Sequence, residues 1–238
     1  MTPFLELIQG ESALDTSKID LLTVDSPLRD WRQRLRLTGD VEVDASLPLL
    51  VYGGYYPLGK VLLFKGSLFK QKGEEGFVFT TDMPEAFTQR VTMDTTPQAV
   101  LKREFEAFGL SCELMETTLR HEVILDGSVY SRVQELALKE TPERCWWIDT
   151  DGAAWWGLID ESPRWNAAPL WLDSRRDILA LDSKGKLATV RFMPWAAGGH
   201  CVILDDPVDK RELIQSAVFN VTHQYKRNEG FLTKISYL

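Results

Sequence analysis

The feature that most constrains the fold is a series of short apolar runs separated by turn signals between residues 47 and 165. LPLLVYGGYY is followed by Pro57-Leu58-Gly59 and then by KVLLFKG, which predicts two strands joined by a hairpin. EGFVFTT predicts another strand over 75–81. Asp126-Gly127 is a favoured two-residue hairpin turn, and Asp149 to Gly152 predicts a turn within CWWIDTDGAAWWGLID. This part of the chain therefore predicts a sheet that contains several hairpins.

Three segments carry helix signals, and we predict helices over 26–39, 96–108 and 206–230. Each begins with a capping side chain followed by proline: Ser26-Pro27, Thr96-Pro97 and Asp206-Pro207. The third has the clearest apolar stripe, made of Leu213, Ile214, Ala217, Val218, Val221 and Tyr225. We expect this stripe to be integral to the core. FLTKISYL, at the end of the sequence, predicts a strand.

These elements predict an α+β fold, with a mixed, largely antiparallel sheet and a few flanking helices. Three segments differ in their predicted secondary structure: a helical N-terminal segment over 1–46, a strand-rich core over 47–165, and a strand with a long helix over 166–238. They form separate units or pack together as one domain, and the sequence leaves both arrangements open.

Composition limits the class of protein. The 238 residues carry a formal net charge of −8, which argues against nonspecific nucleic-acid binding. No apolar stretch approaches the roughly 20 residues that span a bilayer, and the N-terminus lacks the pattern of a secretory signal. Three scattered cysteines, Cys112, Cys145 and Cys201, do not form a disulfide or zinc pattern. We expect a soluble, cytoplasmic protein that does not bind membranes.

The most basic patch lies on the first predicted helix. One side of that helix carries Leu28, Trp31 and Leu35, and the other carries Arg29, Arg32 and Arg36. The arginine side is typical of a solvated helix face. The alternative is a local docking site for phosphate, nucleic acid or an acidic partner.

Tryptophan is distributed unusually, because seven of the eight lie between residues 146 and 195. Neighbouring residues in a strand point to opposite faces, so each tryptophan pair of the 145–160 hairpin sends one ring to each face. The predicted partner-binding residues are Trp146, Trp147, Trp155, Trp156 and Trp165. An aromatic core, a protein interface and a small-ligand site all remain open, and nearby acidic residues favour a basic or sugar-like partner over a phosphate.

One family resemblance covers residues 48–150. GKVLLFK (59–65) is similar to a strand of the Nudix domain, and TPQAVLKREFE (96–106) to the second half of the Nudix box, with its Arg103-Glu104 pair. The segment resembles a degenerate Nudix domain, which implies magnesium-dependent hydrolysis of a diphosphate linkage. The helical positions beside Glu104 are Ala107 and Phe108, which cannot bind a metal. The resemblance therefore implies a fold whose active site is lost.

The favoured function is a non-catalytic binding or protein-interaction module that uses the tryptophan-rich region, with another protein as its partner and no cofactor. The first alternative is a diverged metal-dependent hydrolase of a nucleoside-diphosphate-type substrate, which would use Arg103, Glu104 and Mg²⁺. The second is local binding of nucleic acid or phosphate by Arg29, Arg32 and Arg36.

Overall fold

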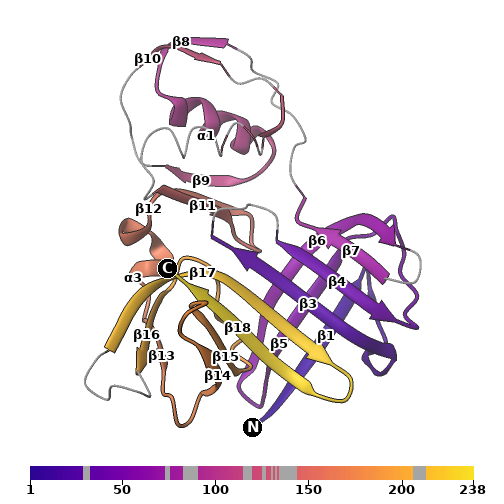
Figure 1. The fold of residues 1–238 in the computed structure, drawn as a ribbon. Coiled ribbons are helices and arrows are strands. Elements are labelled where there is room, and N and C mark those ends of the chain that lie inside the picture. Colours follow the sequence, from indigo (N-terminus) through magenta and orange to yellow (C-terminus); the bar gives the residue numbers. More distant parts are fainter. Residues whose placement is uncertain are drawn as a thin grey trace. The chain divides into compact units, whose positions relative to one another are not determined.

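The computed structural model describes residues 1–28, 33–72, 76–82, 91–114, 120–124, 127–129, 131, 133, 144–205 and 213–238. The chain forms two compact units (Figure 1). The larger unit comprises Met1–Pro27, Arg32–Asp82 and Arg164–Leu238, and the smaller comprises Leu28–Trp31 and Met83–Pro163. Both units draw on residues from more than one of the three segments distinguished in the sequence.

The larger unit is built around one extensive sheet. Its strands are β1 (Thr2–Gln9), β2 (Ser12–Ala13), β3 (Ile19–Pro27), β4 (Arg34–Gly39), β5 (Leu49–Tyr56), β6 (Gly59–Lys72), β7 (Gly76–Thr80), β13 (Leu170–Leu172), β14 (Ile178–Asp182), β15 (Leu187–Arg191), β16 (Cys201–Asp205), β17 (Leu213–Lys226) and β18 (Gly230–Tyr237). The order is β14-β15-β18-β17-β3-β4-β7-β6-β5-β1-β2, and β16 joins β13 to β17. Among the described strands of this unit, only β13 and β16 pair in parallel. Two short helices, η1 (Thr16–Lys18) and α3 (Pro163–Asn166), complete the assignments for residues 1–82 and 163–238.

Two long strands hold this sheet together. β6 pairs with β5 over its first half and with β7 over its second half. β17 pairs first with β16 and then with both β3 and β18; it forms the long yellow hairpin with β18 in Figure 1. Each long strand thus belongs to two neighbouring groups of strands and makes them one sheet.

The larger unit contains two apolar clusters. One lies mainly between the N-terminal strands and includes Leu22, Leu35, Phe64, Phe79 and Phe192. The other lies between the C-terminal strands and includes Leu170, Leu172, Val190, Val218 and Ile235. The candidate site described below is lined by residues from both clusters.

The prediction of a helix over 26–39 is wrong. Ser26 and Pro27 end strand β3, and β4 begins at Arg34 and pairs with β3 through contacts such as Val24 opposite Leu35. In RLRLTG, buried leucines alternate with exposed arginines, which is the period of a half-buried strand. The helix prediction followed the spacing of Leu28, Trp31 and Leu35 and passed over this alternation.

The helix predicted over 206–230 is also wrong, since Leu213–Lys226 is strand β17. The segment is rich in β-branched and aromatic residues, which favour strands. A register shift between Val218 and Asn220 changes which alternate residues face the core. The buried positions Val218 and Val221 are therefore three residues apart, a spacing that imitates a helix.

The smaller unit holds the main helix. Its described elements are β8 (Val91–Thr95), α1 (Pro97–Ala107), β9 (Ser111–Leu114), β10 (Arg120–Ile124), β11 (Arg144–Ile148), β12 (Ala153–Leu158) and η3 (Ile159–Glu161). β8 pairs with β10, and β12 lies between β11 and β9. Within this unit, Figure 1 shows α1 between the β8–β10 pair and β9.

Of the features predicted for this unit, the helix and the 149–152 hairpin are confirmed, whereas the hairpin at Gly127 is not. The helix is confirmed: Thr96 caps α1, and its hydroxyl accepts a hydrogen bond from the Ala99 N–H at 3.2 Å. The 149–152 hairpin is confirmed by the antiparallel pairing of β11 with β12. The strand predicted after Gly127 is not found among the described residues there, because 129, 131 and 133 have helical backbone; Asp126 lies outside the described residues. Val129 and Val133, one helical turn apart, are both buried.

The fold class predicted from the sequence is also wrong. The described part of the chain is mostly antiparallel sheet. Wherever the structure describes the segments 26–39 and 206–230, two of the three expected helices, it shows strands or irregular backbone and no helix. The chain is a largely β protein. Within the described residues, no helix combines the length and the apolar character needed to cross a bilayer.

The β5–β6 hairpin requires glycine at position 54. A Cβ atom there would lie 2.1 Å from the Gly59 carbonyl oxygen, which is backbone and cannot rotate away. We expect Gly54→Ala to lower the free energy of unfolding by about 1–3 kcal/mol, measured by urea denaturation. Gly185→Ala is the matched control, because its added carbon would meet only the movable Asp182 side chain. Equal stability of the two variants would contradict this account of the hairpin.

Candidate interaction site

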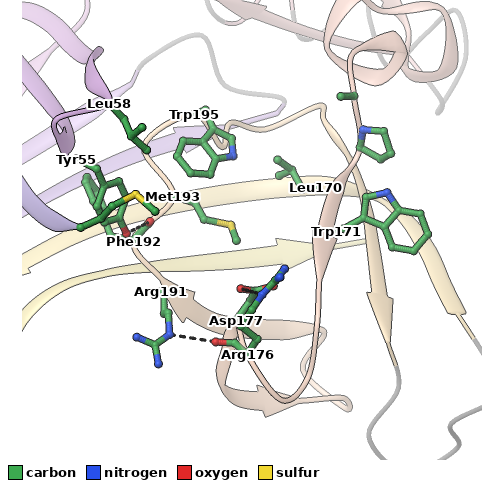
Figure 2. Close-up of a pocket in the computed structure, with 13 residues that line it drawn as sticks. Tyr55, Leu58, Leu170, Trp171, Arg176, Asp177, Arg191, Phe192, Met193 and Trp195 are labelled. Atoms are coloured by element: carbon green, nitrogen blue, oxygen red, sulfur yellow. Dashed lines mark hydrogen bonds and ion pairs between the residues drawn. The ribbon is translucent and has the colours of Figure 1, made fainter.

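A hollow of about 620 Å³ opens on the larger unit. Strand β5 and the turn after it line it, together with β13, the turn that follows β13, and the end of β15 with the segment after it. The side chains that matter for its chemistry are Tyr55, Leu170, Trp171, Arg176, Asp177, Arg191, Phe192, Met193 and Trp195 (Figure 2). Volumes of this size are typical of sites for small molecules or for a few residues of a peptide.

Two tryptophans form the sides of this hollow. Trp171 is 57% exposed and Trp195 is 52% exposed, although indoles are usually much more deeply buried. Figure 2 shows the two rings on different sides of the hollow, with Leu170 drawn between them. Together they present a large apolar area to solvent.

Trp171 owes its exposure to the alternation of strand β13. Leu170 and Leu172 on either side of it are buried in the C-terminal apolar cluster. Because neighbours in a strand point to opposite faces, burial of the two leucines directs Trp171 outward. Packing of the leucines therefore fixes the strand that carries the indole.

The segment that carries Trp195 is held by hydrogen bonds from three strands. The Tyr55 hydroxyl of β5 donates to the Phe192 carbonyl at 2.6 Å, and the Met193 N–H donates to the Thr233 hydroxyl of β18 at 2.9 Å. The His223 ring of β17 contacts the Ala196 carbonyl at 3.1 Å. Trp195 thus lies between anchored residues on a segment that has no helix or strand of its own.

His223 is buried beneath this segment in its neutral form. Since the Ala196 carbonyl can only accept, Nε2 of His223 carries the proton, and Nδ1 accepts from the Thr233 hydroxyl at 3.1 Å. Burial lowers the pKa of His223 to about 4, partly opposed by its hydrogen bond to the Ala196 carbonyl. The Phe192 ring meets the imidazole edge-on at a centroid distance of 5.9 Å.

Glycine at position 53 leaves room for Phe192. A Cβ atom at Gly53 would lie 2.7 Å from the Phe192 ring and 2.6 Å from a methyl group of Leu63. The missing side chain in β5 therefore allows Phe192 to pack against the sheet, which places the residues after it at the hollow.

The polar side of the hollow carries two guanidinium groups and one carboxylate. Arg176 donates to both oxygens of Asp177, at 3.0 and 3.1 Å, and this pairing lowers the pKa of the carboxyl and raises that of the guanidinium. The Asp173 N–H also donates to Asp177 at 3.2 Å. Arg191 uses Nε to donate to the Arg176 carbonyl at 3.0 Å, and it forms no ion pair with any described residue. The lining therefore has an excess of one positive charge.

The tryptophans predicted to bind a partner lie elsewhere. Trp146, Trp147 and Trp156 are buried in the smaller unit, and Trp155 is half-buried. The rings do face opposite sides of the hairpin, but each side is covered by its own apolar cluster. Their burial leaves little ring area for a partner, and their role in binding stays a prediction. Trp165, in α3, is half-buried.

The described arginine and hydrolase residues, Arg36, Arg103 and Glu104, do not line the hollow. Arg36 is exposed on β4, while Arg29 and Arg32 lie outside the described residues, so phosphate or nucleic-acid binding by these three stays a prediction. Arg103 and Glu104 lie on α1, where they form an ion pair at 4.0 Å. In the described part of the chain, no three His, Cys, Asp or Glu side chains gather closely enough to hold a metal ion.

Trp171 and Trp195 were not among the site residues predicted from the sequence. One signal was present, because in LWL a tryptophan alternates with two leucines, a pattern that buries one face of a strand and exposes the other. The exposure of Trp195 had no comparable signal, since it depends on hydrogen bonds to residues distant in the sequence.

No protein-family model matches the sequence, and a search of curated proteins finds no match. Solved structures do match. The 43 kDa tail protein of prophage MuSo2 from Shewanella oneidensis has a TM-score of 0.70 and 10% identity, over 100% of this chain and 97% of that one. A tail protein from Neisseria meningitidis MC58 has a TM-score of 0.66 and 13% identity, over 100% and 96%.

The chain has the fold of these tail proteins. A third similar structure is an Escherichia coli component of the type VI secretion system, described as structurally similar to the T4 bacteriophage tail proteins gp27 and gp5. It has a TM-score of 0.60 and 12% identity, over 98% of this chain and 76% of that one.

The tail-protein fold overturns the Nudix resemblance. The GKVLLFK segment lies in β6 of the larger unit, whereas the helix with Arg103 and Glu104 lies in the smaller unit. The two halves of the resemblance therefore belong to different units. Its basis was a strand and a capped amphipathic helix, and both are common to many folds.

Proposed function

We propose that this chain is a non-catalytic structural component of a protein assembly of the tail or type VI secretion kind. The observation that carries the proposal is the extent of the fold match: two tail proteins are matched over the whole of this chain and over nearly all of their own length. A match of this extent includes both units, so it does not rest on one widespread domain. The proposed partners are other proteins of the assembly, and the proposed compartment is the cytoplasm.

The form of the larger unit supports a structural role. Its core is a continuous, mostly antiparallel sheet whose long strands β6 and β17 each join two groups of strands. This unit also exposes Trp171 on β13 and Trp195 on the segment that follows β15. Tryptophan is enriched among the residues that contribute most to protein interfaces.

The proposal predicts that the chain is found in assembled particles. In the organism that encodes it, we expect the protein to sediment with purified tail-like particles and to keep a fixed ratio to the other particle proteins, measured by quantitative mass spectrometry. Deletion of its gene should abolish assembled particles in electron micrographs, and a plasmid copy should restore them. Normal particles without the chain would contradict the proposal.

A further inference from the structure

We infer that the hollow between Trp171 and Trp195 binds a peptide segment of a partner protein, with an aromatic or branched aliphatic side chain between the two indoles and a carboxylate on Arg191. This inference rests on the proposed structural role, which calls for binding surfaces on the larger unit. All residues that line the hollow belong to that unit.

The lining has the composition of a protein-binding surface. Tryptophan, tyrosine, methionine and arginine are enriched in the centres of interfaces, and Trp171, Trp195, Tyr55, Met193 and Arg191 all line this hollow. Two half-exposed indoles on different sides give an apolar side chain two surfaces to contact at once. Covering these rings would remove a large apolar area from water.

The site is organised before any partner binds. The chain around Trp195 is fixed at Phe192, Met193 and Ala196 by side chains of three separate strands. The strand that carries Trp171 is fixed by its buried leucines. A rigid aromatic site loses little conformational entropy on binding, so more of the contact energy appears as affinity.

The charges favour a carboxylate in the bound segment. Asp177 is already paired with both donors of Arg176 and with the Asp173 N–H. The Arg191 guanidinium forms no ion pair with a carboxylate of the described residues, although its charge also contributes to the lowered pKa of Asp177. Guanidinium binds carboxylate through two parallel hydrogen bonds, which gives direction as well as attraction.

The same hydrogen bonds argue against a sugar. A sugar site needs several polar groups that converge on hydroxyls, but the Tyr55 hydroxyl, Arg176 and Asp177 are engaged within the protein. Strand β13 also favours an extended segment, because it pairs with β16 along one edge and no other described strand pairs with it. A strand edge of this kind accepts a peptide through main-chain hydrogen bonds.

The test is selection of short random peptides displayed on phage against the intact protein, with removal of peptides that also bind the Trp171→Ala, Trp195→Ala double variant. We expect the recovered peptides to share an aromatic or branched aliphatic residue close to Asp or Glu. A fluorescein-labelled synthetic copy of the strongest peptide should bind with a Kd that rises at least about tenfold for either single tryptophan variant, measured by anisotropy. Arg191→Gln should weaken binding and reduce its dependence on salt.

Leu179→Ala is the matched control, since Leu179 is an apolar residue with 57% exposure on β14 that does not line the hollow. Its Kd should equal that of the wild type, and circular dichroism should show that all variants are folded. The inference is overturned if no peptide is enriched over the double variant, if the enriched peptides lack acidic residues, or if the tryptophan variants bind equally well. It is also overturned if a sugar panel raises the melting temperature only when both tryptophans are present, or if light scattering shows self-association that the tryptophan variants abolish.

Particle assembly separates this inference from the proposed function. Particles that contain the chain and form normally with both tryptophans replaced would refute the peptide site and leave the structural role intact. Peptide binding by a chain that is absent from particles would refute the structural role and leave the peptide site intact.

Discussion

Replacing Val218 by aspartate should prevent the larger unit from folding. Val218 is fully buried in the C-terminal apolar cluster, and its N–H and C=O are both used, in hydrogen bonds with His200 and Gly199 at 2.9 and 2.8 Å. A carboxylate at this position would be buried without a partner. We expect a loss of more than about 4 kcal/mol in the free energy of unfolding, seen as insoluble protein or as loss of the β-sheet circular dichroism.

Phe219→Asp provides the control for this experiment. Phe219 is the next residue of β17, but it is 40% exposed and belongs to neither apolar cluster of the larger unit. The control should remain soluble with a native spectrum, which would show that a new negative charge in this strand is tolerated. A soluble, native Val218→Asp variant would contradict the placement of Val218 in the core.

Lowering the pH from 7 to 5 should destabilise the protein through His223. The pKa of this buried ring is about 4 in the folded chain, against about 6.5 when it is exposed by unfolding. Between these values the unfolded chain binds a proton that the folded chain does not, so the free energy of unfolding falls as the pH falls through this window. We expect His223 to lower the free energy of unfolding by about 2 kcal/mol between pH 7 and pH 5, measured by urea denaturation at each pH.

Comparison with the His223→Gln variant isolates the contribution of His223 to the pH dependence of stability. Glutamine can donate to the Ala196 carbonyl but does not titrate, so the variant should lose about 2 kcal/mol less than the wild type over the same pH change. Equal pH dependence in the two proteins would show that His223 is not buried as a neutral ring.

Some local features of this protein can be predicted from its sequence because neighbouring residues determine them. The turn at 57–59, the hairpin at 149–152 and helix α1 with its Thr96 cap all appear where the sequence places them. In each case glycine, proline or a capping hydroxyl fixes the backbone by itself. The burial of Val218 also follows from the sequence, although the helix assigned to it does not.

Other features were decided only by contacts between distant residues. Leu28, Trp31 and Leu35 have helical spacing, yet Arg34–Gly39 is a strand because it pairs with β3 on one side and β7 on the other. The bulge in β17 gives that strand the apolar spacing of a helix, and its pairing with β3, β16 and β18 overrides local preference. The preference of a segment for a strand depends on packing against its neighbours in the sheet, so pairing partners decide the outcome where the local pattern is ambiguous.

The candidate site likewise combines features set by neighbouring residues with features set by contacts between distant residues. The concentration of tryptophan between residues 146 and 195, and the leucines on either side of Trp171, can be read directly from the sequence. The burial of Trp146, Trp147 and Trp156 and the exposure of Trp171 and Trp195 depend on the folded chain. The physical reason is that exposure depends on what packs against a ring: Tyr55 reaches Phe192 from 137 positions away in the sequence, and no local pattern encodes that distance.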